Sequence, residues 1–287
     1  MGGPARRGER AEGANLSDIL SGQVVEPALL AELYDLEHDE ITEDLAFYRE
    51  MVARHRVALL DLGCGSGRLF PAFVAGGASR VVGIDGSPAL LARAEQRIVA
   101  DPTLRAARED GRIELAEGDL RTVHRPDRFG MVVMAGVMSH LDGPEDAVRA
   151  LACAREVLDR DAVVVIDTIG PGGLPPHDLP LSVDWELEHR GRRFVRRSQL
   201  VRRETPEGLR VAYSTLTDVV EPDGTISRLP ASFRLWYPTA VALADLAVEA
   251  NLEVEAVFGS YDLDPLDDES ERCIVVARRA ASDLGER

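Results

Sequence analysis

The sequence contains few cysteines, few aromatic residues and no long apolar run. The three cysteines, Cys64, Cys153 and Cys273, lie far apart and lack CxxC spacing or a histidine-rich neighbour. We therefore expect neither disulfides nor a bound metal. No apolar stretch approaches the roughly 18 residues of a membrane-spanning helix, and the N-terminal residues contain no apolar signal segment. We expect no membrane association and a cytoplasmic location.

Positive charge is also scarce. The chain has 33 Lys and Arg residues against 50 Asp and Glu residues, a net charge of −17. Because nucleic-acid binding depends on cation contacts with phosphates, we expect no nucleic-acid partner. A length of 287 residues with 45% hydrophobic content can form one large core with an insertion. A small molecule is the favoured partner, and a protein is the alternative.

Short β-branched runs alternate with longer amphipathic segments from residue 57 onward. This order predicts a doubly wound α/β fold with a mainly parallel sheet covered on both faces. The predicted strands are 57–62, 80–84, 112–117, 131–135 and 162–168, and the predicted helices between them are 68–76, 88–101 and 145–159.

The two ends of the chain and one internal segment differ from this pattern. We expect residues 1–15 to form a disordered arm. We expect residues 16–56 to form a helical lid with helices at 16–34 and 42–55. Residues 57–184 form the α/β core, and 185–237 alternate polar and apolar residues, which predicts an insertion of three antiparallel strands. The core resumes in 238–287 with helix 239–250 and strands 252–259 and 273–277.

A glycine-rich turn follows the first predicted strand in "VALLDLGCGSGRLF". Ligands of open α/β sheets bind beyond the carboxyl ends of the strands, and glycine lets the backbone approach them closely. A dinucleotide fingerprint that began at Gly63 would need a small residue where Arg68 stands. Asp61 suits a cationic ligand better than a pyrophosphate. S-adenosylmethionine (SAM), with its ammonium and sulfonium groups, is such a ligand.

The stretch "LLDLGCGSG" resembles the first motif of class I SAM-dependent methyltransferases. Three later stretches, "VVGIDGS", "AEGDLRTV" and "MAGVMSHLDGPED", resemble the family at the ends of the next three strands. The resemblance implies a Rossmann-like methyltransferase sheet, SAM as cofactor and S-adenosylhomocysteine as product. It also implies the following cofactor-binding residues: Tyr34, Tyr48, Asp61, Gly63, Cys64, Gly65, Gly67, Asp85, Gly86, Asp119, Leu120, Met134, Ala135 and Gly136.

The resemblance assigns particular tasks within this set. Asp85 accepts hydrogen bonds from the ribose hydroxyls, and Asp119 reaches the adenine amine. Tyr34 closes over the methionine end, with Tyr48 as the second choice for that position. His140 is the candidate general base because its ordinary pKa is near neutrality, and the alternative is that it packs over the cofactor. We take His140 and Tyr34 as the catalytic candidates.

Small-molecule members of the family carry three antiparallel strands as a roof over the active site, and residues 185–237 occupy that place in the chain. The resemblance makes the substrate-binding candidates His38, Trp185, Arg234, Trp236 and Tyr237. Trp236 and Tyr237 could instead form a hydrophobic seam. The arginine-rich stretch "HRGRRFVRRSQLVRR" is interpreted as a half-exposed strand with a solvated face.

The predicted function is methyl transfer from SAM to a small molecule at nitrogen, oxygen or aromatic carbon, in secondary metabolism. The Asn/Asp-Pro-Pro-Tyr and Pro-Cys motifs of other methyltransferases are absent. Three alternatives stay open: a noncatalytic SAM-binding protein, an NAD-dependent oxidoreductase on a similar sheet, and a protein methyltransferase.

Overall fold

The computed structural model describes residues 26–55 and 57–280, which group into a large and a small unit. The large unit contains residues 26–177, 202–211 and 234–280, and the small unit contains 178–201 and 212–233. The predicted N-terminal arm and the first part of the predicted helix 16–34 lie outside the described residues.

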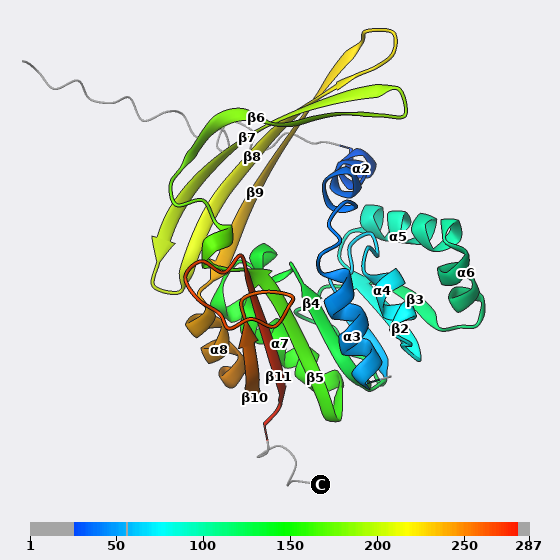
Figure 1. The fold of residues 1–287 in the computed structure, drawn as a ribbon, viewed down its shortest axis with the longest axis vertical. Helices are drawn as coiled ribbons and strands as arrows, with labels where there is room; N and C mark the ends of the chain where they lie inside the picture. Colours follow the sequence, from blue (N-terminus) through cyan, green and yellow to red (C-terminus); the bar gives the residue numbers. More distant parts are fainter. Residues whose placement is uncertain (1–25, 56, 281–287) are drawn as a thin grey trace, which may run out of the picture. The chain divides into compact units, whose positions relative to one another are not determined.

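The large unit is built on a seven-stranded sheet (Figure 1) in the order β10-β11-β5-β4-β1-β2-β3. Strands β1 to β5 run parallel, and β11 joins β5 in the antiparallel sense. This is the doubly wound α/β sheet that the alternating pattern predicts. Its strands are β1 (Ala58–Leu62), β2 (Arg80–Asp85), β3 (Ile113–Glu117), β4 (Phe129–Ala135), β5 (Leu158–Ile169), β10 (Leu252–Phe258) and β11 (Arg272–Arg279).

Helices cover both faces of this sheet, and several begin at recognisable signals. In α5, Ser87 caps the first turn and proline occupies the next position, as helix N-termini favour. Asp101 and Pro102 start α6 in the same way, a helix that the periodicity did not predict. The helices are α2 (Pro27–His38), α3 (Leu45–His55), α4 (Phe70–Ala75), α5 (Pro88–Ala100), α6 (Pro102–Glu109), α7 (Pro144–Val157) and α8 (Ala240–Glu249), with short turns η1 (Met138–His140) and η2 (Pro171–Gly173).

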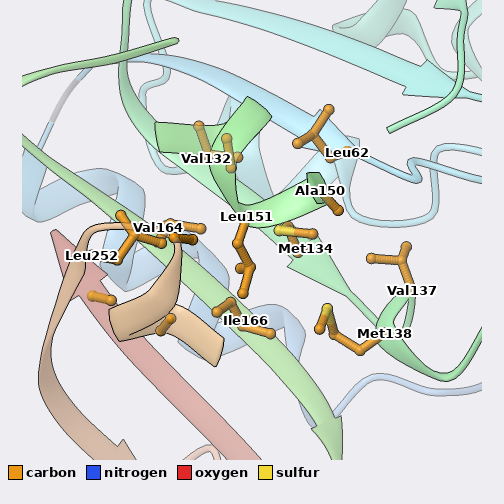
Figure 2. Packing of buried hydrophobic residues seen from close by; sticks show 14 of the residues in the cluster. Leu62, Val132, Met134, Val137, Met138, Ala150, Leu151, Val164, Ile166 and Leu252 are labelled. Atoms are coloured by element: carbon orange, nitrogen blue, oxygen red, sulfur yellow. The ribbon is translucent and has the colours of Figure 1, made fainter. Parts of the chain in front are cut away.

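Each face of the sheet has its own hydrophobic cluster. One joins the sheet to α7 and α8 through residues such as Ala150 and Leu151, which Figure 2 shows close to Met134. The other joins the sheet to α3, α4, α5 and α6. Because both faces are covered, only the ends of the strands are left to bind a ligand.

The antiparallel sheet has four strands in the order β6-β7-β8-β9, not the three that the sequence predicted. They are β6 (Leu179–His189), β7 (Arg192–Thr205), β8 (Gly208–Val220) and β9 (Ile226–Pro238). The stretch from Trp185 to Glu204 was interpreted as one strand, but a turn at Arg190 and Gly191, both with positive φ, folds it into a hairpin. Residues 189–193 are all polar or glycine, so the alternation is interrupted at this turn, but Arg190 stands where asparagine or aspartate usually marks such a hairpin.

The arginines of this sheet are paired with carboxylates on neighbouring strands. Asp218 accepts hydrogen bonds from Arg197 at 2.7 Å and from Arg228 at 2.6 and 3.0 Å. Arg196 is buried, against the prediction of a solvated face, and its guanidinium lies over the rings of Trp185 and Tyr213. The charge of the stretch is therefore neutralised locally.

Candidate functional site

The glycine turn after β1 lies at the centre of the carboxyl edge of the large sheet. Gly63 has φ +81°, and a Cβ there would lie 2.0 Å from Val137 Cγ1. Gly65 has φ +55°, and a Cβ there would lie 3.2 Å from the Tyr34 hydroxyl oxygen. Both positions need glycine, because the left-handed conformation and the close neighbours exclude a side chain. The turn therefore packs directly against the segment after β4 and against α2.

Asp61, at the end of β1, is a buried carboxyl group with a side chain that receives no hydrogen bond from the described part of the chain. Burial, with the nearby charge of Asp85, raises the pKa of Asp61 to about 7. A buried carboxylate without a donor is costly unless a cation or donor reaches it. Asp61 therefore fits a cationic ligand, as predicted from its place before the glycines.

Asp85, at the end of β2, holds the turn in shape. One carboxylate oxygen, Oδ2, accepts a hydrogen bond from Gly65 N–H at 2.9 Å, and the other, Oδ1, accepts one from Ser87 N–H at 2.8 Å. Each carboxylate oxygen has a second lone pair, so Asp85 can still accept ribose hydroxyls. Gly86, which follows it, is exposed at the same edge.

Helix α2 brings Tyr34 and His38 to the turn. Their rings stack with centroids 4.1 Å apart, and His38 Nδ1 lies 2.8 Å from the backbone oxygen of Tyr34. Burial raises the pKa of Tyr34 to about 12, and Asp61 and Asp85 add to this rise. Tyr34 is therefore protonated at neutral pH and contributes a hydroxyl group beside Gly65.

Three arginines fix the N-terminal helices to the core. Arg68 forms a two-point ion pair with buried Asp44, with Nη1 2.9 Å from Oδ1. Arg93 Nε donates to Asp35 at 2.5 Å. Arg97 donates both to Asp39 at 2.6 Å and, through Nε, to the carbonyl of Ser66 in the glycine turn at 3.0 Å.

His140 ends the η1 turn that follows β4. Its imidazole keeps solvent contact. The surrounding protein desolvates the ring and thereby lowers the pKa of His140. The charge of Asp85 opposes this shift, and the charge of His38 adds to it. His140 is therefore neutral at pH 7 and can accept a proton. Ala135 and Gly136 lie on the same segment, half-buried and exposed respectively.

Cys64 is a buried small residue of the turn. Desolvation, together with the charges of Asp61 and Asp85, raises the pKa of its thiol, so the reactive thiolate is disfavoured. This supports a packing role over a redox role. All three cysteines are free.

Asp119 and Leu120 follow β3. The carboxylate of Asp119 is exposed and forms a bidentate ion pair with Arg121, with one Nη2–Oδ2 distance of 2.6 Å. Hydrogen bonds from Arg121 lower the pKa of Asp119 to about 2. Leu120 is half-buried against the core cluster. A contact between Asp119 and an adenine would have to share the carboxylate with Arg121.

Three of the predicted site residues have buried side chains that face the core. Tyr48 is fully buried, and its hydroxyl donates to Asp167 at 2.9 Å, so its side chain does not line a ligand site. Trp236 is also fully buried and belongs to the cluster beside α8, which corrects its assignment to the substrate. Met134 packs among Leu62 and Ala150 (Figure 2), so only its backbone can reach the edge.

The other substrate candidates are not grouped together in one unit. Trp185 belongs to the small unit, where it pairs with Arg196 across β6 and β7. Arg234 is exposed and Tyr237 half-buried on the part of β9 that belongs to the large unit. Their assignment to an acceptor stays a prediction.

A polar cluster at the end of β5 was missed by the sequence analysis. Asp167 accepts hydrogen bonds from Tyr48 and Tyr261, both at 2.9 Å, and from Arg272 Nε at 3.1 Å. The contributing residues are about 94 to 119 positions from Asp167 in the chain. The one available signal was an aspartate at the end of an otherwise apolar strand.

The chain resembles known proteins in sequence pattern and in structure. Residues 59–161 match the family model described as "Methyltransferase domain". No curated protein matches the sequence.

Within the described residues, no helix is long and apolar enough to cross a membrane.

Three solved structures share the fold. DesVI from Streptomyces venezuelae is 23% identical over 90% of this chain and 100% of its own, with a TM-score of 0.67. The sugar N-methyltransferase KedS8 from Streptoalloteichus is 20% identical over 97% and 100%, with a TM-score of 0.67. The SAM-bound amino pentose methyltransferase CalS10 from Micromonospora echinaspora is 20% identical over 96% and 100%, with a TM-score of 0.58. Residues 59–161 therefore match a methyltransferase domain, and the chain as a whole has the Rossmann-like fold of these methyltransferases.

Proposed function

We propose that the protein transfers a methyl group from SAM to a small-molecule acceptor. The observation that carries this proposal is Asp61, a buried carboxyl group that receives no hydrogen bond from the described residues, beside a turn of three glycines with positive φ. A cationic amino-acid group satisfies this carboxylate, whereas the pyrophosphate of NAD would be repelled by it.

The residues at the edge of the sheet fit the parts of SAM. Asp61 would hold the ammonium group and Asp85 the ribose hydroxyls, and the backbone of the turn at Gly63 and Gly65 would line the site. When bound, SAM supplies a methyl group that its sulfonium already activates, so the protein has to orient the nucleophile and exclude water. Tyr34 would cover the turn from α2.

The acceptor that we propose to test first is an amine on a sugar. KedS8 is described as a sugar N-methyltransferase and CalS10 as an amino pentose methyltransferase, and their fold extends over nearly all of this chain. An amine attacks only in its neutral form, and His140, neutral at pH 7, would receive the proton that the amine loses. Hydroxyl and aromatic carbon acceptors remain the alternatives.

The remaining assignments complete the proposal. Arg234 and Tyr237 of the large unit would contact the acceptor, with His38 next to Tyr34. The role of the insertion 185–237 and of Trp185 toward the acceptor stays an expectation from the family resemblance. We propose a cytoplasmic enzyme without a nucleic-acid partner, which the net charge of −17 supports.

The experiment is calorimetric titration with SAM, S-adenosylhomocysteine and NAD in parallel. We expect micromolar binding of the two adenosyl ligands and none of NAD. Asp85→Ala should weaken SAM binding by about 1–3 kcal/mol, because hydrogen bonds to a charged group are lost. Asp110→Ala, an exposed acid on the turn after α6, should leave the affinity unchanged. Binding of NAD alone would refute the proposal.

A further inference from the structure

The cluster around Asp167 brings together four separate parts of the chain. Asp167 lies near the end of β5 and is 1% exposed. Tyr48 comes from α3, Tyr261 from the loop after β10, and Arg272 from β11. Both tyrosine hydroxyls donate to the same oxygen, Oδ2, and Arg272 donates twice to Oδ1. The carboxylate is therefore fully satisfied by protein donors.

The cluster lies at the edge of the sheet that carries the glycine turn. Asp167 is the register partner of Ala135, and its backbone oxygen accepts a hydrogen bond from Gly136 N–H at 2.8 Å. Asp167 also lies on the same face of the sheet as Asp61, because Asp61 pairs with Val133, and Ala135, two residues further along β4, pairs with Asp167.

The two tyrosines differ in access. Tyr48 is 0% exposed, whereas Tyr261 is only partly buried and its ring packs against Phe47. Each hydroxyl donates its hydrogen atom to Asp167 in a hydrogen bond, so its oxygen can act toward any other group only as an acceptor. Burial and the charge of Asp167 raise the pKa of Tyr261, which keeps this hydroxyl protonated at neutral pH. Of the two tyrosines that contact Asp167, only Tyr261 therefore has a side chain with access to the surface.

We propose that the hydroxyl oxygen of Tyr261 contacts the cationic, methyl-bearing end of the cofactor, and that Asp167 positions this oxygen by holding its proton. This inference rests on the proposed use of SAM. An oxygen that can only accept hydrogen bonds suits a polarised methyl group or an ammonium group. It also has no free hydrogen atom to donate, so it would not bind the lone pair of the nucleophile that receives the methyl group.

Three ligands distinguish contact with the cationic centre from a general effect on the fold. SAM has a methylated sulfonium, S-adenosylhomocysteine has a neutral sulfur, and sinefungin has an amine-bearing carbon at the same place. Their dissociation constants should be measured by calorimetry for the wild type and for Tyr261→Phe. We expect sinefungin to lose about ten-fold in affinity relative to S-adenosylhomocysteine, the order expected for one hydrogen bond to a charged group. SAM should lose a smaller factor.

Tyr48→Phe is the matched control. It removes an equal hydrogen bond to the same oxygen of Asp167, but from a hydroxyl that is fully buried. A merely structural role predicts that both variants weaken all three ligands alike, and that result would overturn the inference. The inference is supported if only Tyr261→Phe changes the ratio of sinefungin to S-adenosylhomocysteine affinity. If the wild type binds none of the three ligands, the proposed function itself fails.

Discussion

The ends of β1 and β5 each carry a buried aspartate, and the two aspartates differ in the hydrogen bonds that their side chains receive. Asp61 is 2% exposed and receives no hydrogen bond from the described residues, whereas Asp167 is 1% exposed and receives hydrogen bonds from two tyrosines and an arginine. Burial is thus the same at both sites, and only the donors differ. The carboxylate without donors is the one suited to a ligand, and the satisfied one serves as scaffold.

The largest effect should follow removal of the charge from the scaffold aspartate. Asp167→Asn leaves the partly buried guanidinium of Arg272 without its counter-ion and disturbs two tyrosine hydroxyls. We expect the free energy of unfolding to fall by about 3 kcal/mol, as for other buried pairs that lose one partner. Chemical denaturation measures this directly.

Glu253→Gln provides the control for that variant. Glu253 pairs with Arg278 across β10 and β11, but both side chains are about half exposed. We expect a change below about 0.5 kcal/mol, because exposed pairs contribute little. Equal losses in the two variants would show that the Asp167 cluster is no more than a surface contact.

Removal of the charge from Asp61 should change the free energy of unfolding in the opposite direction. The folded state raises the pKa of Asp61 above its ordinary value of 3.8, so the ionised group opposes folding at and above neutral pH. Asp61→Asn should therefore raise the free energy of unfolding of the ligand-free protein at pH 8 by about 2 kcal/mol, and it should have little effect near pH 4. The same variant should bind SAM weakly. Destabilisation at pH 8 would contradict our interpretation of Asp61.

The pH dependence of binding sharpens the same comparison. Between pH 6 and pH 8 the Asp61 carboxyl group loses its proton. The titratable and charged groups that interact with it are Asp85, Arg68 and Tyr34. Because a cation prefers the carboxylate, SAM affinity should rise about ten-fold over this range. Calorimetry at the two pH values tests this, and Asp61→Asn should flatten the profile. A flat wild-type profile would place the cation elsewhere.

Among the aspartate variants, the smallest effect is expected in the antiparallel sheet. Hydrogen bonds from Arg228, and then from Arg197, lower the pKa of Asp218 to about 2. Its contribution is therefore present above about pH 4 and is lost as the pH falls through about 2. Asp218→Asn should cost about 1 kcal/mol or less at pH 7, since both arginines are partly exposed. Thermal unfolding at pH 7 measures it, and a loss as large as that of Asp167→Asn would break the ranking.

The parallel sheet and the glycine turn could be predicted because their signals are local. Asp61, Gly63 and Gly65 lie within five residues, and the alternation of strand and helix sets the carboxyl edge where they meet Asp85. Tyr34 was placed by resemblance, and the structure brings it against Gly65.

The parts that the sequence did not reveal depend on distant contacts. Tyr48 has the spacing of a helix face, and nothing near it in the chain indicates that its hydroxyl meets Asp167. Tyr261 lies in an acidic loop that gave no signal of its own, and Trp236 was assigned to substrate from its neighbours although it packs beside α8. The fourth antiparallel strand was missed because Arg190 occupies a positive-φ position that glycine or asparagine usually marks.

The ion pairs between α2, α3 and the core have a consequence for where the folding unit begins. The matched domain starts at residue 59, yet Asp35, Asp39 and Asp44 lie upstream and neutralise arginines that follow the glycine turn. A fragment cut at the domain boundary would expose the guanidinium groups of Arg68, Arg93 and Arg97 without their counter-ions. A piece of this protein that is exchanged between relatives as a working module therefore has to include α2 and α3 as well as the matched domain.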